Sequence, residues 1–350
     1  MAPALSVRIK GGGVAAACCQ TLLTQANVAF RREPAPRPKV PAVMLSPATQ
    51  SLLTDVFGRR DLLDGLHLVR RRMVTWGSGD LVALPHSAVV VSEEELLLRL
   101  AAATPAGEVI GEGDGSSDGL TATWTIQASG SMSGAAPLRD FGSRPATAAQ
   151  VKLTAAADSQ ACSMEAVTDG WLFLVPSGGE TAWLLAAGGP VETLLSQSRQ
   201  ISPQIDRVIA NGGSFPSHPR IAESLCAAGD GGAPGFLACG SAAIAFDPLC
   251  GDGTGHAVRE AILACAIARA QQLQTAPDDL LWEYRLRLWS GFKRHLEHCH
   301  EFYSTGGSSD WWKAQCAAIE EGLRWMATQR SPIPLGRYRL NGFSLERSAT

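Results

Sequence analysis

The sequence predicts an α/β fold, on three observations. Leu5 to Lys10 alternates like a strand, and glycines at 11–13 precede an Ala/Leu-rich helix that reaches about Gln25. Strand-like segments recur from 150 to 185 and are separated by Asp-Gly and Ser-Gly-Gly turns. The segments 278–303 and 309–328 show helical periodicity. A strand–turn–helix start, an inserted antiparallel sheet and a helical C-terminal region are therefore expected.

Composition limits the class of protein. The 350 residues are 45% hydrophobic and 18% charged, which is typical of a globular chain with a sizeable core. The net charge of −3 gives no reason to expect a nucleic-acid partner. Nine cysteines without a CxxC pair predict neither structural zinc nor a disulfide framework. With no apolar run of membrane-spanning length, we expect a reduced, cytoplasmic protein without a metal site.

The N-terminal unit matches the dinucleotide-binding fingerprint. Gly11, Gly13 and Ala16 occupy its three small-residue positions, between a predicted strand and a predicted helix. A second strand over 27–31 should end in an acidic residue that holds a ribose, and Glu33 lies slightly beyond it. Glu33 either does this in a shifted turn or is a surface charge. Arg37, in a proline-rich extended segment, faces either a pyrophosphate or water.

Several further elements and the domain boundaries follow from local signals. Ser46-Pro predicts the capped start of a helix. The strand-like segments 66–76 and 81–91 predict a hairpin, and Ser92 with Glu95 predicts a capping box at the start of another helix. We predict a discontinuous nucleotide-binding domain over 1–140 and 200–275, with the strands near 65–91 also compatible with the sheet. The sheet domain spans 141–199, and the helical region spans 276–350.

A glycine-rich segment follows the sheet. Phe236 to Cys239 reads as a short buried strand, and it is followed by a turn of small residues and an Asp247-Pro248 loop. Glycines at 251, 253 and 255 then open a long Ala-rich helix. Such glycines beside a helix N-terminus let backbone N–H groups approach an anion or a polar ring. The segment is typical either of a ligand-binding crossover or of a plain tight connection.

Together these motifs resemble a known family. They are similar to the motifs of the FAD-dependent monooxygenases of the aromatic-hydroxylase type. The motifs that carry the resemblance are Gly11-Gly-Gly13-x-x-Ala16, Pro36-Arg37, Ala128-Ser-Gly130, Asp169-Gly-Trp-Leu-Phe and above all Gly240-Ser-Ala-Ala with Asp247-Pro-x-x-Gly-x-Gly253. The branch with flavin-dependent halogenases and geranylgeranyl-reductase-like enzymes is the most similar. The same outline resembles the small flavoproteins of quinone-cofactor oxidases, which are thought to hydroxylate a tryptophan of a partner protein.

The resemblance implies a Rossmann-like FAD-binding domain of the p-hydroxybenzoate-hydroxylase type with an interleaved antiparallel substrate sheet. It assigns the phosphate–ribityl region to the 240–242 turn and the isoalloxazine ring to the 247–255 loop. With the N-terminal candidates, the implied FAD-binding residues are Gly11, Gly13, Ala16, Glu33, Arg37, Gly240, Ser241, Ala242, Asp247, Pro248, Gly251, Gly253, Thr254 and Gly255.

Two departures from the family pattern bear on FAD binding. Ser241 stands where the family usually has a ribityl-binding Asp, and Arg31 stands about where it has the ribose-binding Glu. Replacing a charge-assisted hydrogen bond by a neutral one weakens a contact by on the order of 1 kcal/mol, so weakly held FAD is expected. Trp171-x-Phe173-x-Val175-Pro176 is only an outline of the halogenase signature, which disfavours chlorination.

The implied activity is hydroxylation of an electron-rich aromatic group through a flavin C4a-hydroperoxide. The substrate is either a small aromatic molecule or a tryptophan in a protein or peptide, and NAD(P)H or a partner flavin reductase supplies electrons. The alternatives are a non-catalytic maturation or binding component and a geranylgeranyl-reductase-type enzyme. His86 and Glu165 are the acid–base candidates, although both also fit as ordinary strand residues. His295, His298 and His300 are expected on a helix surface.

Overall fold

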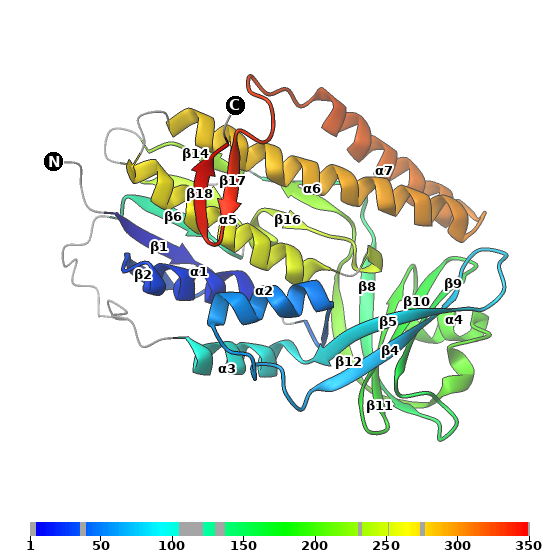
Figure 1. Cartoon of the computed structure of the whole chain (residues 1–350). Coiled ribbons are helices and arrows are strands. Elements are labelled where there is room, and N and C mark those ends of the chain that lie inside the picture. Colours follow the sequence, from blue (N-terminus) through cyan, green and yellow to red (C-terminus); the bar gives the residue numbers. More distant parts are fainter. Residues whose placement is uncertain are drawn as a thin grey trace.

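The computed structural model describes residues 5–35, 40–104, 122–129, 137–229, 233–250, 252–273 and 277–348. Two large sheets and a set of long helices make up these parts of the chain (Figure 1). The α/β class and the predicted order of strand–turn–helix start, middle sheet and helical C-terminal region are confirmed.

A five-stranded sheet of mainly parallel strands holds the N-terminal unit. Its order is β14-β15-β6-β1-β2, in which only β14 runs antiparallel to its neighbour. The strands are β1 (Ser6–Lys10), β2 (Ala29–Glu33), β6 (Trp124–Gln127), β14 (Cys226–Ala227) and β15 (Gly235–Ala238). Helices α1 (Gly13–Gln25) and α5 (Gly253–Leu273) lie side by side against this sheet (Figure 1). Helix α1 begins at the carboxyl end of the parallel strand β1, and this is the edge at which ligands bind in open α/β sheets.

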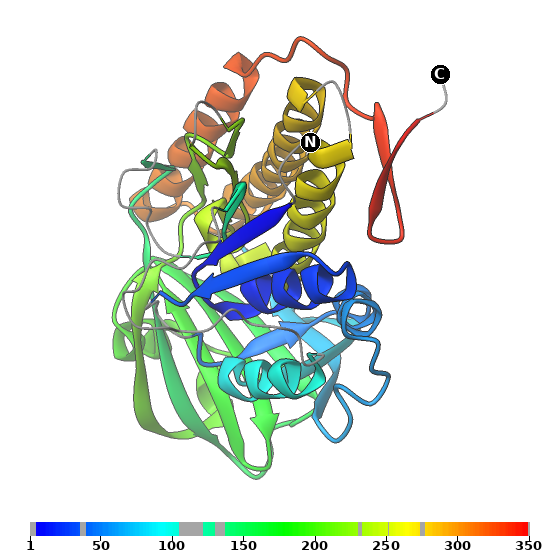
Figure 2. The same ribbon diagram turned by 90° about the vertical axis from the view of Figure 1, so that its left-hand side faces the viewer.

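An eight-stranded sheet forms the second layer, in the order β12-β8-β11-β10-β9-β4-β5-β3. It fills the lower part of Figure 2. Its strands are β3 (Val43–Leu45), β4 (His67–Thr75), β5 (Val82–Val91), β8 (Pro145–Leu153), β9 (Ala161–Val167), β10 (Gly170–Gly178), β11 (Thr181–Ala187) and β12 (Ile205–Pro216). The predicted hairpin near 65–91 therefore pairs with the middle sheet, through parallel pairing of β4 with β9. The predicted domain division stays a prediction.

The edge strand β12 has no counterpart in the sequence-based prediction. Nearly all of its residues are exposed, and its pairing with β8 is interrupted by three register shifts. A strand of this kind carries no alternation of apolar and polar residues, which is the signal that predicts strands. A three-stranded sheet of β7 (Leu138–Asp140), β13 (Arg220–Ala222) and β16 (Ile244–Ala245) was not predicted either.

Two further helices begin at the serine caps that the sequence predicts. Ser46 caps α2 (Pro47–Phe57) and Ser92 caps α3 (Glu93–Ala103), each through its hydroxyl. The short helices are α4 (Val191–Gln197), η1 (Ser202–Gln204), η2 (Gly240–Ala242) and η3 (Pro248–Cys250). Among the described helices, none combines the length and the apolar character needed to cross a membrane.

Long C-terminal helices close the molecule above the eight-stranded sheet (Figure 2). These are α6 (Pro277–Gly306) and α7 (Asp310–Thr328), followed by the hairpin of β17 (Tyr338–Asn341) and β18 (Ser344–Arg347). Trp171 of β10 donates its indole N–H to the Tyr303 hydroxyl at 2.9 Å, and Trp312 donates to the Val167 carbonyl at 3.1 Å. These buried tryptophans fix the helices to the sheet.

Candidate active site

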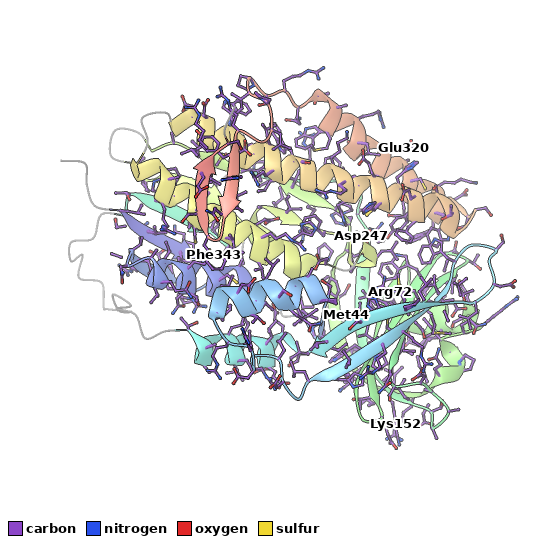
Figure 3. The ribbon with its side chains drawn as sticks, viewed as in Figure 1. Met44, Arg72, Lys152, Asp247, Glu320 and Phe343 are labelled. Carbon is purple, nitrogen blue, oxygen red and sulfur yellow. The ribbon has the colours of Figure 1, made fainter. Side chains whose placement is uncertain are left out.

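A cavity of about 370 Å³ lies between the five-stranded sheet, the eight-stranded sheet and the start of α5. One end is lined by residues 12–15 at the start of α1, and the middle by the 240–241 turn. The other end is lined by residues 244–248 and by the inner face of the eight-stranded sheet. Met44 and Asp247, which both line it, lie near the centre of the molecule (Figure 3).

The glycine turn before α1 is built for close backbone approach. Gly11 has a φ of +104°, and a Cβ there would lie 2.6 Å from the Ser129 backbone nitrogen. Gly12 donates its N–H to the Ser129 hydroxyl at 2.7 Å, which ties β1 to the end of β6. No side chain caps α1, and its first turn holds no acidic residue. Its free N–H groups and positive dipole end fit a pyrophosphate.

The strand register shows that β2 extends past Arg31, the residue expected near its end, to Glu33. The parallel pairing of β1 and β2 sets Arg8 opposite Arg31 and Lys10 opposite Glu33, so Glu33 ends the strand beside the glycine turn. The Glu33 carbonyl accepts the Gly11 N–H at 2.8 Å, and its carboxylate lies 3.2 Å from the Arg8 guanidinium. Glu33, rather than Arg31, therefore occupies the strand end at which this fold holds a ribose.

The 240–242 turn rests on a buried carboxyl group. Gly240, with a φ of +55°, donates its N–H to the Glu260 carboxyl at 2.7 Å. Glu260 lies on α5, is buried and lines the cavity. Burial raises the pKa of Glu260 to about 8, with the Gly240 N–H opposing the shift. At neutral pH the group is therefore mostly uncharged and does not repel an anion held in the middle of the cavity.

This pKa predicts a pH-dependent stability. The folded state keeps the Glu260 proton up to about pH 8, whereas an unfolded Glu loses it near pH 4.3. The native state thus binds more protons between these values, and the free energy of unfolding falls as pH rises, by at most roughly 1.4 kcal/mol per pH unit. Glu260→Gln should lose this dependence. Urea unfolding from pH 5 to 8 measures it, with exposed Glu192→Gln as a control, and curves parallel to the wild type would contradict it.

The Asp247 carboxylate forms a buried ion pair. Arg144, directly before β8, donates to it, and both side chains are almost fully buried. The Arg144 guanidinium also donates to the Ser217 carbonyl at 3.0 Å and to Gln315 at 2.7 Å, and it lies 4.6 Å from the Tyr303 ring centroid. Burial raises the pKa of Asp247, and Arg144 opposes this shift. The pair holds the 247–250 loop to the sheet and to the C-terminal helices.

The position of His295 differs from the helix-surface position expected from the sequence. It is buried rather than on the helix surface, and its Nε2 accepts the Asp247 backbone N–H at 2.8 Å. The Phe246 ring lies edge-on to it, with ring centroids 4.8 Å apart. Helical periodicity places His295 on the same face as Phe292 and Leu296, but the sequence does not show that a loop 48 residues earlier covers that face.

Apolar side chains of the eight-stranded sheet form the far wall of the cavity. Phe173 and Val175 of β10, Trp183 and Leu185 of β11, and Phe215 of β12 all line it. Cross-strand pairing sets Phe173 opposite Leu185 and Val175 opposite Trp183, so these side chains share one face of the sheet. Such a wall suits a flat aromatic ring.

Neither acid–base candidate borders this cavity. Glu165 pairs with Leu172, on the sheet face opposite Phe173, and it accepts backbone N–H groups of Arg199 at 2.7 Å and Ile201 at 3.0 Å. It therefore anchors the loop after α4. His86 is half-buried on β5, and burial, followed by the nearby Arg72 charge, lowers its pKa.

The structure gathers half of the sequence-predicted FAD-binding residues around the cavity. Those that line it are Gly13, Gly240, Ser241, Asp247, Pro248, Gly253 and Thr254. Gly11, Ala16, Glu33, Ala242 and Gly255 support the surrounding turns and helices without lining it. Arg37 and Gly251 lie outside the described residues.

Two residues of this region escaped the sequence analysis. A feature of the sequence could have indicated that Glu260 is buried, because it is a carboxylate in the Ala-rich stretch of α5 and residues 261–268 after it are all apolar. No local feature indicates the role of Arg144, since its partner Asp247 lies 103 residues further along the chain.

No protein-family model and no curated sequence matches the chain. Solved structures do. The flavin-dependent halogenase CmlS aligns over 94% of this chain and 71% of its own, with a TM-score of 0.73 and 16% identity. The chain has the fold of the flavin-dependent halogenases and monooxygenases. This confirms the resemblance inferred from the motifs, as far as the fold is concerned.

Two hydroxylating enzymes are among these structural neighbours. The peptidyl tryptophan dihydroxylase QhpG, essential for tryptophylquinone cofactor biogenesis, aligns over 99% of this chain and 86% of its own, with a TM-score of 0.71 and 16% identity. The p-nitrophenol 4-monooxygenase PnpA from Pseudomonas putida DLL-E4 aligns over 93% of this chain and 96% of its own, with a TM-score of 0.65 and 16% identity.

Proposed function

We propose that the protein is an FAD-dependent monooxygenase that hydroxylates an electron-rich aromatic group. The observation that carries this proposal is that one cavity joins the glycine-lined start of α1 to the apolar wall of the eight-stranded sheet. The start of α1 suits the phosphates of a dinucleotide, and the apolar wall suits an aromatic ring. A dinucleotide and an aromatic substrate would therefore meet in the same cavity.

Several of the predicted residues would hold the cofactor. The first N–H groups of α1, beginning with that of Gly13, would hold the pyrophosphate, and Glu33 would hold the adenosine ribose. Ser241 would donate to the ribityl chain, and Pro248, Gly253 and Thr254 would lie along the isoalloxazine ring. Arg37 would face the pyrophosphate, and Gly251 would lie along the isoalloxazine ring. Bound FAD supplies the activation of oxygen.

The other side chains of the cavity orient the substrate and exclude water. Phe173, Val175 and Phe215 form an apolar face that can hold a ring flat and keep water from the reacting atoms. The buried Arg144–Asp247 pair fixes the loop that carries Pro248. No proton-transfer role is assigned to His86 or Glu165.

We also propose that the aromatic group is a side chain of a protein or peptide, as it is for QhpG. A second, more polar hollow of about 730 Å³ adjoins the cavity, and Ala42 and Trp183 line both. The larger hollow has room for a polypeptide segment while the cavity takes its ring. NAD(P)H or a partner flavin reductase as electron source, and a cytoplasmic location, are further proposals.

Oxygen-dependent turnover tests the activity. The chain with added FAD is reduced chemically, mixed with a tryptophan-containing peptide and then exposed to oxygen. One or two hydroxylations are expected to give a product about 16 or 32 mass units heavier with ordinary oxygen, and about 18 or 36 mass units heavier with ¹⁸O₂. Product formed without oxygen would indicate a reductase, and flavin reoxidation without any product from peptides or small aromatics would contradict the proposal.

Ser241 allows a gain-of-affinity prediction. It is exposed toward the cavity, at the position where the family has a ribityl-binding Asp. Ser241→Asp should strengthen FAD binding by on the order of 1 kcal/mol, about fivefold in Kd. Flavin fluorescence titration measures this, and exposed Ser196→Asp on α4 is the matched control. Equal or weaker binding by Ser241→Asp would show that the ribityl chain does not lie at this turn.

A further inference from the structure

A further hollow, of about 450 Å³ and distinct from the one beside Trp183, lies on the other side of the 246–248 loop, between the first turns of α5 and the middle of α6. Phe246 lines both this hollow and the main cavity, so its ring separates them. The charged and titratable residues that line the hollow are Asp252, His256, Arg259, Arg294, His295 and His298.

Positive charge exceeds negative charge in this hollow. Arg259 forms an ion pair with Asp252 at 3.0 Å, and Asp252 also accepts from the Thr49 hydroxyl at 2.8 Å. Arg294 is exposed and, within the described parts of the chain, has neither an ion pair nor a hydrogen bond. The single carboxylate of the hollow is thus already engaged, and one guanidinium is left over.

The histidines add hydrogen-bonding capacity without adding charge. His256 stacks on the Phe246 ring with centroids 3.9 Å apart. Burial and the neighbouring Arg259 and Arg294 charges lower its pKa to about 4, against the opposing effect of Asp252. His256 is therefore neutral at pH 7 and has an N–H to donate. His298 is exposed at the mouth of the hollow.

Gly291 keeps the α6 side of the hollow open. A Cβ at this position would have no atom within 4 Å. A glycine inside a long helix costs about 1 kcal/mol relative to alanine. Here it leaves space beside Arg294, which lies one turn further along the same helix.

We propose that this hollow is an anion-binding site for a phosphate group, held by Arg294 and Arg259 with an N–H from His256. Guanidinium groups are well suited to phosphate because their donors match its oxygens in geometry and charge. The phosphate is either inorganic or part of a nucleotide. Among the described residues, Phe246 alone lines both this hollow and the main cavity, so the arginines and His256 lie outside the proposed FAD site.

Two probes distinguish the sources of phosphate. Inorganic phosphate and adenosine 2′,5′-bisphosphate are each titrated into the full chain at pH 7 and low ionic strength, by calorimetry and by NMR of the histidine rings. Saturable binding and an upward shift of the His256 pKa are expected, because an anion stabilises imidazolium. Tighter binding of the bisphosphate would indicate a nucleotide ligand, and equal binding would indicate free phosphate.

Two variants test the residues. Arg294→Gln should weaken phosphate binding at least tenfold. The control variant Arg199→Gln, at an exposed arginine outside the hollow, should leave phosphate binding unchanged. Gly291→Leu improves helix propensity and fills the hollow, so it should fold and lose binding. The proposal is overturned if neither probe saturates, or if Arg294→Gln binds as the wild type does. FAD titration of the same variants shows separately whether the flavin proposal holds.

Discussion

Replacing Arg144 by methionine is expected to lower the free energy of unfolding by about 3–5 kcal/mol. The substitution leaves the Asp247 carboxylate buried without the guanidinium that pairs with it. A charge in that position must be protonated or exposed to water, and either change loosens the loop that carries Pro248. Urea unfolding followed by tryptophan fluorescence measures the loss.

A surface pair provides the matched control. Lys152 lies 3.2 Å from Glu180, and their side chains are 35% and 77% exposed; Figure 3 shows Lys152 at the outer end of the sheet. Lys152→Met should change stability by no more than about 1 kcal/mol. Adding Asp247→Asn to Arg144→Met should restore part of the loss, because it removes the unpaired charge. If Arg144→Met costs no more than Lys152→Met, the ion pair does not hold this loop.

Gly11→Ala is expected to lower the free energy of unfolding by roughly 3–5 kcal/mol, and to abolish FAD uptake. The alanine would be forced into a backbone conformation with φ +104°, and its Cβ would lie 2.5 Å from the Ser129 hydroxyl oxygen. Moving Ser129 away also breaks its bond with the Gly12 N–H, which positions the start of α1. Chemical unfolding and FAD titration measure the two effects.

The variant Gly336→Ala separates the cost of backbone strain from the cost of the steric clash with Ser129. Gly336 has a similar φ of +95°, but a Cβ there would have no atom within 4 Å. Its substitution should cost only the backbone strain, about 1–3 kcal/mol, and leave FAD uptake intact. Equal losses for the two variants would mean that the close approach of Ser129 contributes nothing.

Local signals predicted most elements that carry the site. The strand–glycine–helix start, the Ser46 and Ser92 caps and the long C-terminal helices all depend on residues that are neighbours in sequence. Predictions of this kind succeed because capping and periodicity act over a few residues. Even the placement of Glu33 needed the strand register, which local sequence does not provide.

Interactions between distant segments could not be predicted in the same way. The Arg144–Asp247 pair and the contact of His295 with the 247 loop join elements that meet only in the folded chain. The exposed strand β12 is held by its backbone pairing with β8, not by an apolar face. In each case the partner, rather than the residue's own neighbours, determines the structure.

Titration of the purified chain with FAD tests whether this protein is a flavoprotein. We expect saturable uptake of one FAD per chain, seen as a flavin absorption band that remains after gel filtration or as quenched flavin fluorescence, and we expect its loss in Gly11→Ala. A chain that carries no flavin absorption and shows no saturable uptake of added FAD would rule out the proposed cofactor and with it the proposed activity.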